Sequence, residues 1–355
     1  MRKALTNLAL QFLRDKRKDR DRTLAKKRKR CYSGIGGQAV LEGIMMKNKN
    51  AYAVAVRLPN GKITVDRQDI SGSISSGAVG KVPFVRGVFT FVDSMILGMK
   101  TLTYSASFYE EEEETKGDGV LNKIFKEKTE DVVMGFTVCI SMLLAIGLFM
   151  FLPYLISELV SRWILNDSLI AIIEGVVRIL IFVLYVLLIS LMKDIRRLYQ
   201  YHGAEHKCIN CIESGRELTV RNVMRCSRLH RRCGTSFMLI VMCISIILFF
   251  FIRTDSMLMR IVYRLLLIPV VAGISYEILR LAGRSDNLLV RIISAPGMWL
   301  QKITTREPEP DMVEVAIAAI EAVFDWRAFE EKRFGKKTAP AEEEQADIKK
   351  GMVSQ

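Results

Sequence analysis

Residues 168–192 read SLIAIIEGVVRILIFVLYVLLISLM, and this stretch decides the class of fold. An α-helix needs about 20 predominantly apolar residues to cross roughly 30 Å of hydrocarbon. The stretch is long enough to form a transmembrane helix, and it carries only two charged side chains, Glu174 and Arg178. Because these lie one helical turn apart, we expect them to neutralise each other as a structural pair. A polar pathway through the membrane is the alternative.

Three further stretches are apolar and close to the required length, namely residues 132–153, 236–252 and roughly 261–282. The last of them begins beside Arg260 and contains Arg264, whose side chains must extend toward the membrane surface or find partners. Together the four stretches predict an α-helical integral membrane protein with about four transmembrane helices and a small cytoplasmic α+β portion.

The positive residues of the loops predict the orientation in the membrane. Residues 193–235 hold ten Lys or Arg, whereas residues 154–167 hold only Arg162 and residues 253–256 hold only Arg253. Cytoplasmic loops of membrane proteins carry an excess of Lys and Arg. We therefore expect a multi-pass protein with the 193–235 loop and both termini in the cytoplasm.

The chain is strongly basic. Its 355 residues have a formal net charge of +14, and half of them are hydrophobic, which is typical of a membrane part joined to soluble basic segments. Residues 1–30 alone hold thirteen Lys or Arg, and this pattern predicts a tail held against anionic lipid headgroups. Because the lipid bilayer and membrane topology account for the positive charge, we expect no nucleic acid partner.

The soluble segments have patterns of their own. Residues 51–56 and 62–66 favour strands on either side of a turn, which predicts a hairpin. Residues 83–104 place apolar side chains on one stripe, which predicts an amphipathic helix on the membrane surface. The predicted organisation is a basic cytoplasmic tail (1–30), a cytoplasmic glycine-rich segment with hairpin and amphipathic helix (31–110), a charged linker (111–131), transmembrane helices 1 and 2 (132–192), a cytoplasmic His/Cys motif loop (193–235), transmembrane helices 3 and 4 (236–282), cytoplasmic amphipathic segments (283–325) and a charged tail (326–355).

The three histidines of the chain all fall within 29 residues, and clustered His is typical of a metal site. His202 and His206 are four residues apart on a helix that continues from the second span, so both imidazoles share one face and can chelate one Zn²⁺. With Glu205 as a general base, this string matches the zinc-hydrolase signature H-x-x-E-H. The alternative is an ordinary exposed helix face.

His230 and Cys233 extend the cluster just before the third span, at the same membrane boundary. If all four side chains bind, the site is closed and structural; if one stays free, water occupies an open position. Glu277, near the cytoplasmic end of the fourth span, is a further ligand or else a member of an ion pair. The expected cofactor is a divalent transition metal, with Zn as the first choice.

The seven cysteines are odd in number and lie mostly on the predicted cytoplasmic side, which favours reduced thiols or metal ligands over disulfides. Cys208 and Cys211, taken with His230 and Cys233, form a rival ligand set for a closed zinc knuckle. The glycine-rich segment 34–43 permits close backbone approach, and we expect it to fold into a turn that packs on the site.

Five motifs together resemble the YqhQ-like family of bacterial membrane proteins. They are GGQAVLEGIMM at 36–46, VRGVF at 85–89, YHGAEHK at 201–207, HRRCGTSF at 230–237 and QKITTREP at 301–308. The resemblance covers most of residues 33–325. Members of the family contain a domain of unknown function and are described as predicted metal-dependent enzymes. The resemblance therefore implies a bacterial plasma-membrane location and a metal, and it implies no substrate.

The family motifs fall on particular positions of this chain. These are Gly36, Gly37, Gln38, Glu42, Gly43, Arg86, Gly87, His202, Glu205, His206, His230, Arg232, Cys233, Gly234, Thr235, Thr304, Thr305, Arg306, Glu307 and Pro308. Cys208 and Cys211 lie outside the family pattern, which weakens the knuckle interpretation. The chain departs from the pattern at Arg231, where the family often has Pro.

Two functions are consistent with these residues. The first is a metal-dependent hydrolase at the cytoplasmic membrane face, with Glu205 as general base and Arg86 or Arg306 as contacts for an anionic group of the substrate. The second is a metal-stapled, non-enzymatic scaffold or assembly factor that recruits another membrane protein or lipid. A transporter is a third function, and four spans without an internal repeat disfavour it.

Overall fold

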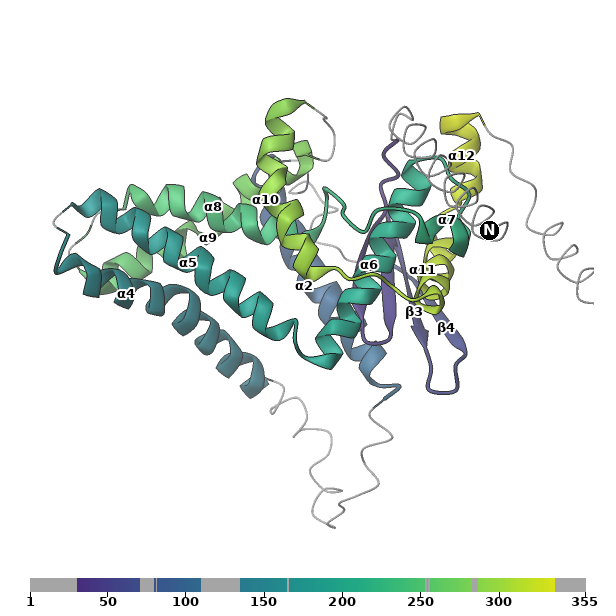
Figure 1. Cartoon of the computed structure of the whole chain (residues 1–355), viewed down its shortest axis with the longest axis horizontal. Helices are drawn as coiled ribbons and strands as arrows, with labels where there is room; N and C mark the ends of the chain where they lie inside the picture. Colours follow the sequence, from purple (N-terminus) through teal and green to yellow (C-terminus); the bar gives the residue numbers. More distant parts are fainter. Residues whose placement is uncertain are drawn as a thin grey trace, which may run out of the picture.

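The computed structural model describes residues 31–70, 80, 82–109, 135–164, 166–252, 254, 256–282 and 287–335. The predicted basic tail (1–30) and charged linker (111–131) lie outside the described residues, and so does the charged tail from residue 336 onward. Most of the described chain is helical, and it contains one small antiparallel sheet. Long helices extend away from the region that holds this sheet (Figure 1).

The sheet is an antiparallel meander of four strands. They are β1 (Gly36–Val40), β2 (Gly43–Asn48), β3 (Ala51–Arg57) and β4 (Ile63–Asp69), paired in chain order. The turns between them place Glu42, Lys49 and Gly61 at positive φ. The predicted hairpin is confirmed as β3 and β4. The glycine-rich segment 34–43 contains the expected turn, at residues 41–42, but its residues 36–40 form strand β1, which pairs with β2.

Helices cover both faces of the sheet. They are α2 (Val85–Ala106), α6 (Lys193–Glu213) and α11 (Pro310–Val323), with the short helices α7 (Val220–Met224) and α12 (Trp326–Phe334) beside the last two. Successive side chains of a strand point to opposite faces. Ile44 and Met46 therefore join the core built with α6 and α11, whereas Met45 and Val54 belong to a second core that Leu97 of α2 covers.

Within the described part of the chain, three helices are long and apolar enough to cross a membrane. They are Gly135–Ser161, which includes the π-helical turn η5 (Gly147–Phe151) and α4 (Leu152–Ser161), Ser168–Ile189 within α5 (Asp167–Ile189), and Val262–Ala282 within α9 (Met257–Ala282). The predicted third span is the apolar helix α8 (Gly234–Phe250), whose 17 residues make it shorter than the other three. Its length is about 25 Å at 1.5 Å per residue.

Three charged residues of the apolar stretches, Glu174, Arg178 and Arg264, form one buried cluster. Glu174 accepts from Arg178 at 2.7 Å, as predicted, and also pairs with Arg264 of α9 at 2.7 Å. Arg178 Nε donates to the carbonyl of Phe149 at 3.1 Å. This carbonyl lacks an α-helical donor because Pro153, four residues later, has no N–H. The cluster thus joins the first described long helix to α5 and α9.

Two helices complete the C-terminal part. The predicted amphipathic segments at 283–325 include α10 (Leu288–Thr304), where Leu288 and Ile292 are exposed and Gln301 is fully buried. Residues 326–334, which we assigned to the charged tail, form α12 instead. This helix forms because Asp325 caps its N-terminus and Trp326 packs into the core beside α11.

Candidate metal centre

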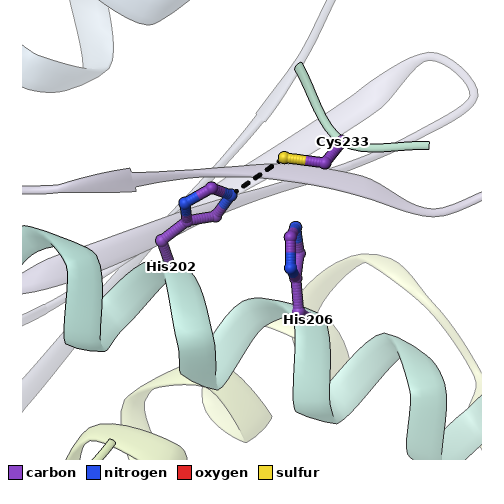
Figure 2. Close-up of side chains that lie close together, drawn as sticks. All are labelled: His202, His206 and Cys233. Carbon is purple, nitrogen blue, oxygen red and sulfur yellow. Dashed lines mark hydrogen bonds between the residues drawn. The ribbon is translucent and has the colours of Figure 1, made fainter. Parts of the chain in front are cut away.

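Two elements bring three ligand side chains together. His202 and His206 lie one turn apart on α6, and Cys233 is the N-cap residue of α8. Figure 2 shows both imidazoles pointing from α6 toward the sulfur. His202 Nε2 is 3.1 Å from Cys233 Sγ, and one ligand atom from each of the three side chains lies within 4.8 Å of the others. Among the described residues, this is the one group of three or more His, Cys, Asp or Glu close enough to hold a metal ion.

Backbone carbonyls orient both rings. His202 Nδ1 is 2.9 Å from the Thr304 carbonyl oxygen, and His206 Nδ1 is 2.7 Å from that of Arg228. A carbonyl oxygen only accepts, so each Nδ1 carries a proton and each Nε2 is the nitrogen available to a metal. Hydrogen bonds of this kind commonly fix the ring of a metal-binding His. The fold therefore orients the Nε2 atoms of both imidazoles before any metal binds.

The position of Cys233 favours a thiolate. Its sulfur lies at the N-terminus of α8, 3.4 Å from the Thr235 N–H and 3.1 Å from the Thr235 hydroxyl. Burial raises the pKa of the Cys233 thiol, but the charges of His202 and His206 outweigh it and hold the pKa well below its usual range. Burial lowers the pKa of His202, whereas the Cys233 thiolate raises it, to about 9. A cation at Nε2 would replace the proton there.

Glu205 lies beside this group, fully within the protein. It packs against Gly37 of β1, where an added Cβ would be 3.0 Å from the Glu205 carboxyl carbon. Burial raises the pKa of Glu205, while the charges of His206 and His202 oppose that effect. The glycine-rich segment thus packs on the site as expected, in the form of a strand. A carboxyl group with a raised pKa is suited to accept and return a proton.

His230 is a neighbour of the group and is engaged elsewhere. Its ring centroid is 5.7 Å from that of His206, but its Nε2 lies 3.5 Å from Glu213 Oε2. Burial lowers its pKa. Gln301 of α10 holds the backbone of His230 through both its N–H and its carbonyl, at 2.8 and 2.7 Å. His230 therefore positions the segment that leads to Cys233.

Glu277 forms an ion pair, which was the second of the two roles considered for it. Its carboxylate accepts from Arg86 at 2.7 and 2.5 Å, so α9 is bound to α2. Arg86, considered as an anion contact, is occupied in this pair. Arg306 Nη2 donates to the Ser190 carbonyl at 3.2 Å, and the Arg306 carbonyl packs against Gly203. The structure thus brings neither Glu277 nor Arg86 into the metal group.

The rival zinc knuckle is absent from the described part of the chain. Cys208 and Cys211 are fully buried in the core between α6 and α11. Residues 208 and 211 lie two and five positions beyond His206, which is about 200° and about 140° around an α-helix. These two thiols therefore point away from His206 and Cys233.

Sequence reasoning missed the groups that orient the ligands. The QKITTREP motif indicated that Thr304 matters, but no side chain signals the carbonyls of Thr304 and Arg228 that accept from the two imidazoles. Gln301 belongs to the same motif, yet its contact with His230 spans 71 residues.

Comparison with known proteins identifies the family. The model of a family described as "Protein of unknown function (DUF1385)" matches residues 82–326, which include every ligand of the group. The chain belongs to this family. A relative from Bacillus subtilis (strain 168), called "Uncharacterized protein YqhQ", is 34% identical over 308 residues, which cover 84% of this chain and 94% of the relative. The resemblance to YqhQ-like proteins is thereby confirmed. No solved structure matches the chain significantly.

Proposed function

We propose that the protein is a metal-dependent hydrolase whose centre is formed by His202, His206 and Cys233 at the cytoplasmic face of a bacterial plasma membrane. One observation carries this proposal: two imidazoles with oriented Nε2 atoms and a thiol converge within 4.8 Å, next to the buried carboxyl group of Glu205.

The donor set fits a transition metal. Thiolate and imidazole are the ligands that Zn²⁺ prefers, and three protein ligands leave one position of a tetrahedron open. A bound Zn²⁺ lowers the pKa of water and polarises a carbonyl. His202 retains some solvent exposure, whereas His206 is buried.

Glu205 supplies proton transfer in this proposal. Burial raises its pKa, so the carboxylate accepts a proton from a nucleophilic water more readily than an exposed Glu would, and it returns this proton to a leaving group. Gly37 leaves room for the carboxyl group against the sheet, and the fixed α6 backbone holds it beside both imidazoles.

We further propose that α8 also crosses the membrane, which gives four spans in all. Near the sheet, α2 contacts the start of α8, where the rings of Phe91 and Phe237 are 5.7 Å apart, and it also contacts α9, where Gly87 packs on Tyr276. At the far end, Phe249 of α8 lies 5.2 Å from the Arg264 guanidinium of α9. The two helices therefore run together between the same two levels, and α9 is long enough to span.

Metal analysis tests the proposal directly. The full chain, purified in detergent without chelators, is expected to contain near-stoichiometric zinc or another transition metal, and the double variant His202→Ala/His206→Ala is expected to lose it. Glu205→Gln should retain the metal but abolish hydrolysis of chromogenic ester and peptide probes. A metal-free parent protein would refute the metal centre, and a metal-loaded parent that hydrolyses none of the probes faster than Glu205→Gln would count against the hydrolase.

A metal-stapled scaffold is the second candidate, and one observation favours it. The apolar side chains Met95 and Ile96 of α2, with Leu288 and Ile292 of α10, are more than half exposed on helices outside the candidate spans. Such surfaces bind lipid or other membrane proteins. In this case the metal joins α6 to α8, and the Glu205→Gln variant should act like the parent in assembly assays while His202→Ala/His206→Ala fails.

A further inference from the structure

A second group of reactive side chains lies at the other end of α6. The side chains of Cys211, in the last turn of α6, and Cys226, two residues after α7, hydrogen-bond to each other. Cys211 Sγ also lies 3.5 Å from the carbonyl oxygen of Arg216 and 3.4 Å from that of Glu217. The two thiols, which are distant in sequence, thus form one pair.

The two members of the pair have different surroundings. Cys226 is half-buried, and its sulfur is 4.0 Å from Arg216 Nη1. Lys207 donates to the Cys226 carbonyl at 3.0 Å, so a second positive charge lies nearby, although it is also paired with Glu307 at 2.8 Å. Cys211 is fully buried. Positive neighbours and partial exposure are the conditions under which a cysteine becomes nucleophilic.

Proton affinities agree with this geometry. The hydrogen bond from Cys211 lowers the pKa of Cys226 to about 7, helped by Arg216 and Lys207 and opposed by burial. The hydrogen bond with Cys226, together with burial, raises the pKa of Cys211. Cys226 therefore loses its proton more readily than Cys211, and while protonated it donates to the Asn222 carbonyl at 3.3 Å.

We propose that Cys226 is a modification site that hydroperoxides oxidise, and that Cys211 converts the product into a Cys211–Cys226 disulfide. With hydrogen peroxide, the Cys226 thiolate attacks one oxygen and becomes a sulfenic acid, the O–O bond breaks, and the departing hydroxide takes a proton to leave as water. The Cys211 sulfur then attacks the sulfenic sulfur, an S–S bond forms, and a second water leaves with the Cys211 proton. The two sulfurs together lose two electrons, which the peroxide accepts.

The pair is separate from the proposed metal centre. Cys208, the nearest other cysteine on α6, is fully buried, and burial raises its pKa. Cys233 lies with His202 and His206, and neither Cys211 nor Cys226 belongs to that group. Oxidation of the pair therefore requires no bound metal, and it can be tested whether or not the metal is present.

Peptide mapping tests the proposal. The full chain in detergent is treated with one equivalent of hydrogen peroxide, remaining thiols are blocked with N-ethylmaleimide, and linked peptides are identified by mass spectrometry. We expect the Cys211–Cys226 disulfide as the main product. Cys211→Ser should instead accumulate a sulfenic acid on Cys226 that dimedone captures, and Cys226→Ser should form no disulfide. Both substitutions replace sulfur by oxygen without adding volume, and circular dichroism checks their folding.

A comparison of rates adds a second measurement. Cys31 is half-buried like Cys226 and serves as its comparator. At pH 7 we expect N-ethylmaleimide to modify Cys226 about tenfold faster than Cys31, because the thiolate is the reacting form. Equal rates, or a disulfide that joins other cysteines, would overturn the proposal. The same result in His202→Ala/His206→Ala would show that the pair acts independently of the metal centre.

Discussion

At the residue scale, the ring orientations of His202 and His206 depend on backbone carbonyl groups. A substitution of a side chain does not remove such a group. Thr304 and Arg228 contribute their carbonyls, so the orientation of the rings depends on where α10 ends and how the segment before α8 runs. The proposed ligands themselves are three ordinary side chains. Substitution of a ligand side chain should therefore remove a metal-binding atom, whereas a substitution that moves the Thr304 or Arg228 carbonyl should only change the orientation of a ring.

Cys233→Ser tests the sulfur ligand. We expect it to reduce the metal content by at least tenfold, because a hydroxyl is a much poorer donor to a transition metal than a thiolate. With Co²⁺ in place of the native metal, the parent should show a near-ultraviolet thiolate-to-cobalt absorption band, and the variant should lack it. Cys208→Ser is the matched control, since Cys208 is a buried thiol outside the group, and it should keep both metal and band.

The pH profile of Cys226 tests its electrostatic surroundings. Because its pKa is lowered to about 7, the thiolate fraction and the alkylation rate should reach half of their maximum near pH 7. Cys211→Ala removes the hydrogen bond that contributes most, so the midpoint should move up toward the ordinary value of 9.0. Stopped-flow alkylation between pH 5 and 10 measures both curves, and an unmoved midpoint in the variant would contradict this account.

At the element scale, the periodic patterns of the sequence predicted much of the fold. Apolar length indicated the long helices, strand-favouring residues on either side of a turn indicated β3 and β4, and helical spacing put His202 and His206 on one face. Local patterns say nothing about groups that meet through tertiary packing. The sequence therefore did not show that β1 covers Glu205, that Gln301 holds His230, or that His230 turns toward Glu213.

The packing of α6 on the segment after α10 depends on one glycine. Gly203 directly follows His202 on α6. A Cβ there would overlap the carbonyl oxygen of Arg306. Gly203→Ala should therefore destabilise the protein by about 1–3 kcal/mol through overpacking, and it should displace the Thr304 carbonyl. Thermal unfolding with and without Zn²⁺ measures this effect. Gly36→Ala, at a position with open space around it, is the control and should leave the melting temperature nearly unchanged.

At the scale of the whole molecule, the charge cluster holds the long helices together. Glu174 is paired with both Arg178 and Arg264, so Glu174→Gln would leave two buried guanidinium groups without a counter-charge. Removal of one partner from a buried ion pair costs about 3–5 kcal/mol. We expect a large fall in the unfolding temperature in detergent. Glu158→Gln, an exposed carboxylate on α4, makes the same chemical change and should have no measurable effect.

The number of spans decides where the ends of the chain lie, because an odd number places them on opposite sides of the membrane. Three helices have the length of a span, whereas α8 has 17 residues, about 25 Å, against roughly 30 Å of hydrocarbon. A difference of this size is accommodated by local thinning of the bilayer at modest cost. Because α8 runs beside α9 between the same levels, we expect it to cross.

Reporter fusions to the full chain show whether the number of spans is odd or even. Green fluorescent protein should fluoresce at either terminus, and alkaline phosphatase at the C-terminus should be inactive, since both ends are expected in the cytoplasm. Trp163→Cys, at an exposed position just after the first long helix, should react with a membrane-impermeant maleimide in intact cells. An active C-terminal phosphatase together with a fluorescent N-terminal fusion would mean three spans. The helix α8 would then have to lie within one leaflet, and α10 would be on the opposite side of the membrane from α6, so that the Thr304 carbonyl could not orient His202.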